Sequence, residues 1–356
     1  RRFGLSFSQC FHGMPVDEKR VREAVANRQK YRDVNTKYNL WIAGTAAVVL
    51  AACAAVLYGP DTGPLDVPVN DPSFITHLNR NAQGWQAGKA DFFQGWTIGD
   101  VQKLLAGVKV SNQAGGLTEC TLPDVVIPRS FDARERWPQC FPGVYDMGNC
   151  SASWAIAAAS SMASRLCIAN PENAGLELSV QQLLSCERKF GKGCEGGMLD
   201  MVWNYMKQDG LVSSTCFPYQ ANGSTPCSFC NDEEPKKLAS ICRLSTVKSI
   251  RQEIFLNGPV VAPVTLMNDF LVYRSGIYKA THTASQFVDL DRQPQLLAVK
   301  VIGWGVDEKL GREFWIIENS FGKDWGENGY AKIELSEGGH SILLSAFAFA
   351  GTPVNP

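Results

Sequence analysis

This chain has no excess of either charge: it contains 34 lysine and arginine residues and 35 aspartate and glutamate residues, for a net charge of −1. The overall charge therefore gives no reason to expect binding to nucleic acid. Histidine is also scarce, with four residues, His12, His77, His282 and His340. Few imidazole groups are thus available to act as a general base. Cysteine, finally, is absent beyond Cys242.

Before that point cysteine is abundant. The 12 cysteines are many for a reducing compartment, and most lie between Cys120 and Cys242. Such clustering predicts a disulfide framework in an oxidising space, with buried free thiols or a zinc site as alternatives. Cys227-x-x-Cys230 is a lone pair with no second pair at zinc spacing. We therefore predict neither a metal site nor a cofactor.

The N-terminal part contains one long apolar segment. Residues 1–40 form a basic tail with nine Lys or Arg against four Asp or Glu, and residues 41–58 are 18 uncharged, mostly apolar residues. As a helix these would extend about 27 Å, enough to cross a bilayer. Trp41 and Tyr58 stand at the two ends, where aromatic side chains favour the membrane interface. We predict a single transmembrane helix; an Ala-rich core helix or an uncleaved signal sequence are the alternatives.

The charges around this segment predict its orientation. The following linker, residues 59–72, contains acidic residues and no Lys or Arg. The basic N-terminus should therefore lie in the matrix or cytosol, with the rest of the chain across the membrane. Because the sequence starts at Arg1 rather than Met, we expect that an N-terminal piece has been removed. This combination favours the mitochondrial inner membrane, with the C-terminal domain in the intermembrane space; a secretory or lysosomal membrane is the alternative.

From Ile127 onward, short motifs follow one another in a recognisable order. They are Pro128-Arg-Ser-Phe-Asp-Ala-Arg-Glu-Arg-Trp-Pro-Gln-Cys140, Gly148-Asn-Cys-Ser-Ala-Ser-Trp-Ala155, Ser179-Val-Gln-Gln-Leu-Leu-Ser-Cys186, Cys194-Glu-Gly-Gly197, Asn257-Gly-Pro-Val260, Tyr273-Arg-Ser-Gly-Ile-Tyr278, Ile302-Gly-Trp-Gly305, Glu318-Asn-Ser-Phe321 and Trp325-Gly-Glu-Asn-Gly-Tyr330. Each is weak alone. In this order and spacing they resemble the papain-like cysteine proteases, and cathepsin B in particular.

The resemblance implies an α+β, two-lobed fold for residues 127–356, with a helical lobe, a β-barrel-like lobe and a cleft between them. Residues 73–108 resemble the cathepsin B propeptide, which lies through the cleft, and residues 109–126 would connect the two parts. We expect Gly196, Gly197 and Trp325 to shape the cleft. The resemblance also implies the disulfides Cys150–Cys194 and Cys140–Cys167. It leaves open the pairing of Cys186, Cys216, Cys227, Cys230 and Cys242.

The positions that carry catalysis in this family hold other residues here. Ser153 stands at the nucleophile position, Leu297 at the histidine position and Met147 at the oxyanion glutamine position, whereas the orienting Asn319 is present. A serine hydroxyl without an adjacent base is a poor nucleophile. We therefore predict a degenerate protease without catalytic activity.

Three functions follow as hypotheses. The first is a structural or accessory subunit of a membrane complex, possibly of the respiratory chain, with the bilayer and other subunits as partners. The second is a membrane-anchored module that binds peptides in its cleft without cutting them. The third is a residual serine-type hydrolase that uses Ser153. Asn222-Gly-Ser224 is a glycosylation sequon, used only if the domain enters the secretory pathway.

Overall fold

The computed structural model of the protein describes residues 65–354, apart from residues 106, 112–115, 229, 231, 290–291, 310 and 336–347. The predicted basic tail (1–40), the transmembrane helix (41–58) and the first part of the linker lie outside the described residues, so these remain predictions. Within the described part, no helix combines the length and the apolar character needed to cross a bilayer.

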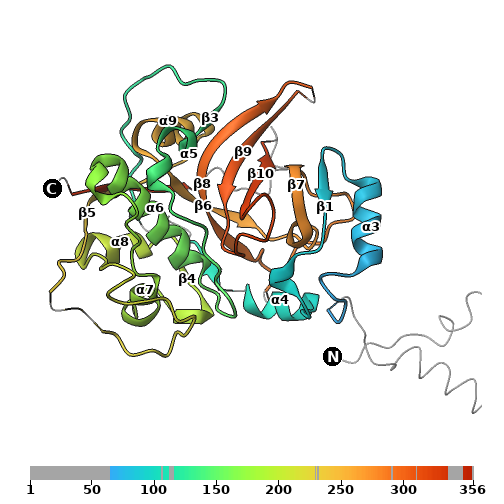
Figure 1. The fold of residues 1–356 in the computed structure, drawn as a ribbon, viewed down its shortest axis with the longest axis horizontal. Coiled ribbons are helices and arrows are strands. Elements are labelled where there is room, and N and C mark those ends of the chain that lie inside the picture. The colour runs from blue at the N-terminus through green and yellow to red at the C-terminus, as the bar shows by residue number, and fades with distance from the viewer. Residues whose placement is uncertain are drawn as a thin grey trace, which may run out of the picture. The chain divides into compact units, whose positions relative to one another are not determined.

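A mixed β-sheet makes up most of one side of the described unit and extends, through its last strands, to the helices on the other side (Figure 1). Its strands follow the order β1-β7-β10-β9-β8-β6-β11-β5, antiparallel except for the parallel pair β7 and β10. The strand bounds are β1 Trp85–Ala87, β2 Val108–Lys109, β3 Phe131–Asp132, β4 Gly197–Met198, β5 Leu238–Leu244, β6 Val260–Thr265, β7 Tyr273–Tyr278, β8 Leu296–Asp307, β9 Arg312–Glu318, β10 Tyr330–Glu334 and β11 Ala348–Pro353. The central strand β8 is buried over most of its length, which explains its mostly apolar sequence.

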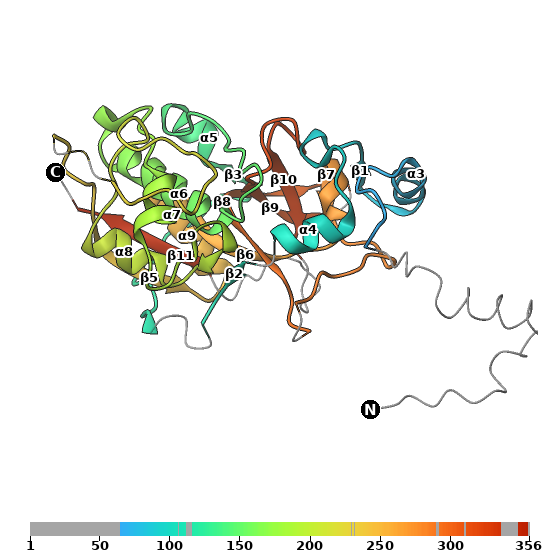
Figure 2. The same ribbon diagram turned by 90° about the horizontal axis from the view of Figure 1, so that it is seen from below.

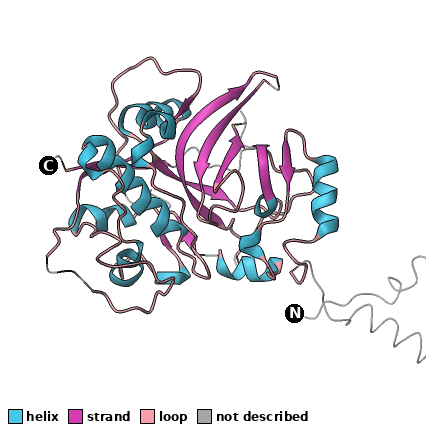
Figure 3. Cartoon of the chain, in the orientation of Figure 1, coloured by secondary structure: helices cyan, strands magenta, loops and turns pink. Residues whose placement is uncertain are grey.

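Helices gather on the other side. Figures 1 and 3 show α6, α7 and α8 together on one side of the unit and strands β7, β9 and β10 on the other, which is the two-lobed arrangement expected. The helix bounds are α3 Pro72–Asn81, α4 Ile98–Leu104, α5 Ala133–Arg136, α6 Ser153–Ala169, α7 Val180–Cys186, α8 Val202–Gln208 and α9 Val247–Asn257. The predicted two-lobed α+β arrangement is thus confirmed (Figure 1).

Helix α6 is the central helix of the helical lobe. Its residues from Ser153 to Cys167 are all buried, because small alanine and serine side chains let neighbouring elements approach on every side. Its serines find backbone partners: Ser161 Oγ donates to the carbonyl of Pro259 at 2.8 Å, and Ser164 Oγ donates to that of Cys140 at 2.8 Å. The N-terminus of this helix is the point at which the nucleophile motif meets the sheet.

Five disulfides hold the described part together, and they resolve the pairing that the sequence left open. Cys140–Cys167 and Cys150–Cys194 are the two expected pairs. The other three are Cys186–Cys227, Cys216–Cys230 and Cys120–Cys242. The two cysteines of the Cys227-x-x-Cys230 pair therefore belong to different disulfides.

The propeptide-like segment packs as an integral part of the unit. Strand β1 adds to the edge of the sheet beside β7, and Trp85 packs against the ring of Tyr278 with 5.0 Å between ring centroids. Helix α4 begins with a capping box formed by Thr97 and Asp100. In Figure 2 this segment runs along the β-rich side from α3 through β1 to α4. Its buried side chains, such as Phe93, join the same hydrophobic core as the protease-like part.

Candidate functional site

The nucleophile position opens helix α6. Ser153 is 1 % exposed, and its Oγ accepts a long hydrogen bond from the backbone N–H of Ala298 on β8, at 3.4 Å. Ala298 directly follows Leu297, the residue at the base position. The structure therefore brings the two catalytic positions together, as the resemblance implies, but the hydroxyl reaches a backbone donor rather than a base.

No imidazole faces Ser153 among the described residues. Leu297 is completely buried, lies in the middle of the sheet and pairs in register with Val264 of β6. His282 is exposed in the loop after β7, and His77 is exposed on α3 beside Asn81. His12 and His340 lie outside the described residues. Since an alkyl side chain takes no proton, the base position here contributes only packing.

A buried lysine three residues after Leu297 on β8 is also bonded to another group. The Nζ atom of Lys300 lies 3.0 Å from one carboxylate oxygen of Glu318 and 3.3 Å from the other, and both side chains are 3 % exposed. Burial lowers the pKa of Lys300, and the charge of Glu318 opposes that shift. Because its hydrogen bonds go to Glu318 and the hydroxyl of Ser153 is bonded to Ala298, the structure shows no serine–lysine pair.

Asn319, the residue that would orient an imidazole, is hydrogen-bonded to the backbone of the next residue instead. Its Oδ1 accepts from the N–H of Ser320 at 2.8 Å. Its Nδ2 is buried and has no hydrogen-bond partner among the described residues. An unpaired buried donor of this kind costs about 1–3 kcal/mol. The amide therefore remains as a part of the site that has lost its partner.

The oxyanion position is filled by a buried thioether. Met147 is fully buried, and its sulfur accepts a hydrogen bond from Ser320 Oγ at 3.6 Å. Its backbone carbonyl accepts from the hydroxyl of Tyr219 at 2.8 Å. A thioether has no N–H to donate to a developing oxyanion. The side chain fixes the loop before α6 and offers no donor in place of the glutamine amide.

The cleft itself is occupied by the chain. Strand β2 lies parallel to β4, and the N–H of Gly197 donates to the carbonyl of Gly107 at 3.0 Å. One step further, the N–H of Leu199 donates to the carbonyl of Lys109 at 2.8 Å. On its other side Val108 pairs with Leu296 of β8, next to the base position. The end of the propeptide-like segment therefore bridges the two lobes directly beside the base position.

The approach of the two backbones depends on glycine. A Cβ at Gly196 would lie 2.0 Å from the carbonyl oxygen of Gly107, and a Cβ at Gly107 would lie 2.4 Å from the carbonyl oxygen of Glu195. Gly196 also has φ of +109°, a conformation that side chains disfavour. Gly196 and Gly197 thus form one wall of the cleft, as expected, and this wall is covered.

Aromatic side chains cover the other end of the cleft. Phe92 stacks on Phe321 with 5.0 Å between ring centroids, and Phe93 meets the edge of the same ring at 5.1 Å. Trp325, expected to shape the cleft, is instead fully buried beneath Phe321, and its indole N–H donates to the carbonyl of Leu271. That expectation is corrected: its contacts with Phe321 and Phe270 make it a core residue.

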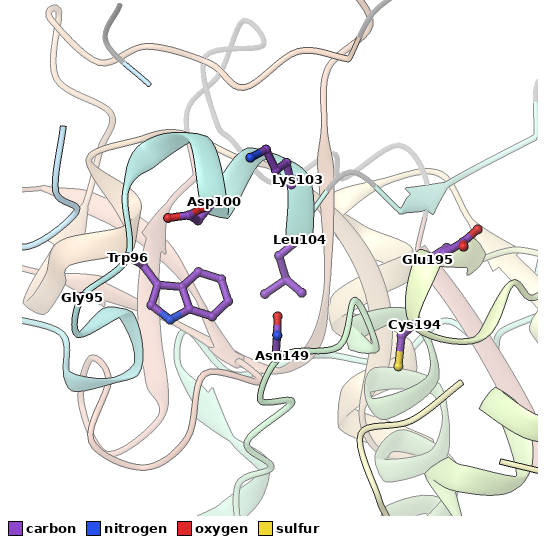
Figure 4. Close-up of a pocket in the computed structure, with 8 residues that line it drawn as sticks. All are labelled: Gly95, Trp96, Asp100, Lys103, Leu104, Asn149, Cys194 and Glu195. Atoms are coloured by element: carbon purple, nitrogen blue, oxygen red, sulfur yellow. The ribbon is translucent and has the colours of Figure 1, made fainter. Parts of the chain in front are cut away.

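One cavity, of about 600 Å³, lies beside the loop that precedes α6. Figure 4 shows Trp96 and Leu104 of the propeptide-like segment facing the same space as Asn149 of the protease-like part. The remaining lining residues are Gly95, Asp100, Lys103, Cys194 and Glu195. The cavity therefore lies at the contact between the propeptide-like segment and the protease-like part.

The two-residue strand β2 was missed by sequence reasoning. It crosses the predicted boundary between residues 108 and 109, and the pairing continues to Ser111, whose Oγ donates to Asp200 at 2.5 Å. A strand of two residues shows no periodicity. The only available signal was Gly107, a glycine able to approach a second backbone closely.

The fold and the site define a class. A central helix that carries the nucleophile position at its N-terminus, a sheet that presents the base position beside it, and a cleft filled by the preceding segment are the architecture of a thiol protease precursor. Residues 127–348 match the papain family of cysteine proteases. The chain belongs to this family.

Its relatives include cathepsin B-like proteins. The chain is 32% identical over 298 residues to a human protein named tubulointerstitial nephritis antigen-like, and the match covers 74% of this chain and 64% of that relative, which is therefore longer than the matched region. It is 30% identical to cathepsin B-like CP3 of Giardia intestinalis, with 75% of this chain and 89% of the relative covered. Among solved structures, procathepsin B S9 of Trypanosoma congolense superimposes with a TM-score of 0.69 at 28% identity, covering 81% of this chain and 100% of that chain.

Proposed function

We propose that this chain is a catalytically inactive member of the papain family. The observation that carries the proposal is Leu297, fully buried at the base position, while the hydroxyl of Ser153 is bonded to the amide of the next residue, Ala298. General-base help is worth a factor of about 10² to 10⁴ in rate, and an oxyanion donor about 10² to 10³. Loss of both, together with the thiolate, leaves no useful proteolysis.

The filled cleft supports a structural role over peptide capture. A peptide that paired with Gly197 and Leu199 would have to displace residues 107–109, whose carbonyls already accept from those two amides. The domain then offers its partners an outer surface rather than a groove. We infer that it acts as a structural or accessory subunit of a membrane assembly, attached through residues 41–58.

The compartment of the folded domain should be oxidising. Five disulfides in the described part support this, because such bonds are rare in reducing compartments. The intermembrane space of mitochondria and the secretory pathway both meet this requirement. Fractionation of cells expressing the full chain decides between these two compartments.

A second candidate function is hydrolysis by Ser153, favoured by one observation: this serine sits at the N-terminus of a helix, where a nucleophile of this fold belongs. Labelling with a fluorophosphonate, which reacts with activated serines, tests both proposals. We expect no more labelling of the wild-type chain than of Ser153→Ala. Labelling that disappears in Ser153→Ala would favour the hydrolase.

Membrane attachment is tested separately. The full chain should stay in the membrane pellet after extraction with alkaline carbonate, whereas a variant lacking residues 41–58 should be released. Release of both proteins would remove the membrane part of the proposal and leave the inactive cleft untouched.

A further inference from the structure

The connector between the propeptide-like segment and the protease-like part contains an exposed stretch. Residues 121–128 have no regular secondary structure, and the side chain of Val126 is 96% exposed. Exposed segments of this kind are where proteases cut. A cut here would separate the cleft-filling segment from the protease-like part along the main chain.

A disulfide lies immediately before this stretch. Cys120 is bonded to Cys242 of β5, 122 residues further along the chain. The backbone follows the same contact: the N–H of Cys120 donates to the carbonyl of Arg243 at 2.9 Å, and the N–H of Arg243 donates to the carbonyl of Thr118 at 2.9 Å. An ion pair of 2.8 Å joins Arg243 to Glu119. The connector is thus fixed to the sheet before it becomes exposed.

The attachment point is a well-held strand. β5 pairs antiparallel with β11, and Cys242 stands opposite Ala350 in that register. The exposed stretch is itself tied down on its far side, because Trp304 Nε1 donates to the carbonyl of Pro128 at 3.2 Å. Main-chain cleavage between Cys120 and Pro128 therefore leaves both new ends anchored.

We propose that the propeptide-like segment is a permanent occupant of the cleft, which the Cys120–Cys242 disulfide retains even after the connector has been cut. The proposal deepens the proposed function, since a segment that never leaves is consistent with a cleft that has no catalytic use. It differs from the arrangement of a removable inhibitor in one respect: the segment and the sheet are held by a covalent bond across the cutting site.

The test inserts a recognition sequence for a site-specific protease after Val126 in the full chain. After complete cutting, denaturing electrophoresis without reductant should show one band, and electrophoresis with reductant should show two. Two bands without reductant would overturn the proposal. This electrophoresis experiment uses no cysteine variant, so its result does not depend on whether such a variant folds.

A matched pair of variants identifies the bond that is responsible. In the same cut background, Cys120→Ser/Cys242→Ser should give two bands without reductant. Cys216→Ser/Cys230→Ser removes a disulfide whose two cysteines both lie in the C-terminal fragment. This variant should give one band without reductant, like the parent. The opposite pattern would assign retention to a different cysteine pair and overturn the proposal.

The outcome is separable from that of the proposed function. Peptide hydrolysis by the cut chain, lost in Ser153→Ala, would refute inactivity even if the segment is retained. Release of the segment without hydrolysis would refute retention alone.

Discussion

The close packing of Gly107 against the cleft wall gives a sharp prediction. Gly107→Ala would place a Cβ 2.4 Å from the carbonyl oxygen of Glu195 and 2.5 Å from Cα of Gly196. These are backbone atoms, so a rotating side chain cannot relieve the clash. We expect residues 107–109 to lift away from β4 while the rest of the unit stays folded.

The expected size of the effect follows from the contacts that would be lost. Two backbone hydrogen bonds, from Gly197 and Leu199, contribute about 1 kcal/mol each. Burial of Val108, now 4% exposed, contributes about 2 kcal/mol. Together these give about 4 kcal/mol, or a factor of about 10³ in the equilibrium for local opening, as an upper bound.

Hydrogen exchange measured by mass spectrometry on peptides covering residues 194–200 reads this opening directly. Exchange in these peptides should accelerate by up to about 10³ in Gly107→Ala. Gly143→Ala is the matched control, because a Cβ at Gly143 meets no atom within 4 Å and the residue lies outside this contact. Unchanged exchange in Gly107→Ala would refute the reasoning that the segment fills the cleft.

Three further predictions concern other parts of the domain. Lys300→Met or Glu318→Leu alone should lower the free energy of unfolding by about 3–5 kcal/mol in chemical denaturation, because each leaves a buried charge unpaired. The double variant should recover most of that loss. Equal losses in all three variants would contradict this prediction. Asn222 is exposed within its sequon, so expression through a eukaryotic secretory pathway should add a glycan that a glycosidase removes, and Asn222→Gln should lack it. Hydrogen bonds from the backbone N–H and side chain of Thr97 lower the pKa of Asp100 below its ordinary 3.8. The ionised carboxylate therefore stabilises α4 above pH 3.8, and this stabilisation is lost as the pH falls through the lowered pKa of Asp100. Hydrogen exchange of the α4 amides, corrected for intrinsic rates, should accelerate in that pH range in the parent chain and not in Asp100→Asn.

The motifs predicted much of the fold and of the site. The short sequences around Ser153 and Leu297 assign these two positions, and in the structure the hydroxyl of Ser153 meets the backbone N–H of Ala298, the residue after Leu297, because the two motifs fall in the central helix and the central strand. Ser153 opens α6, and Leu297 and Glu318 fall in β8 and β9. Local sequence suffices where a motif fixes both the element and its position.

Other features depended on contacts that local sequence does not encode. The Cys120–Cys242 disulfide joins residues far apart in the chain, and disulfide connectivity cannot be deduced from cysteine spacing. The position of Trp325 depends on its packing against other aromatic rings, among them Phe321, which it meets edge to face. The short strand at Val108 exists only because β4 and β8 lie on either side of it.

The central claim is that none of the groups that the structure places beside Ser153 can take its proton. The most direct test is hydrolysis of a diverse peptide library by the purified chain, before and after the connector is cut, with Ser153→Ala measured in parallel. We predict that the two proteins give the same background under every condition. Cleavage products formed by the parent chain and absent from Ser153→Ala would contradict the account.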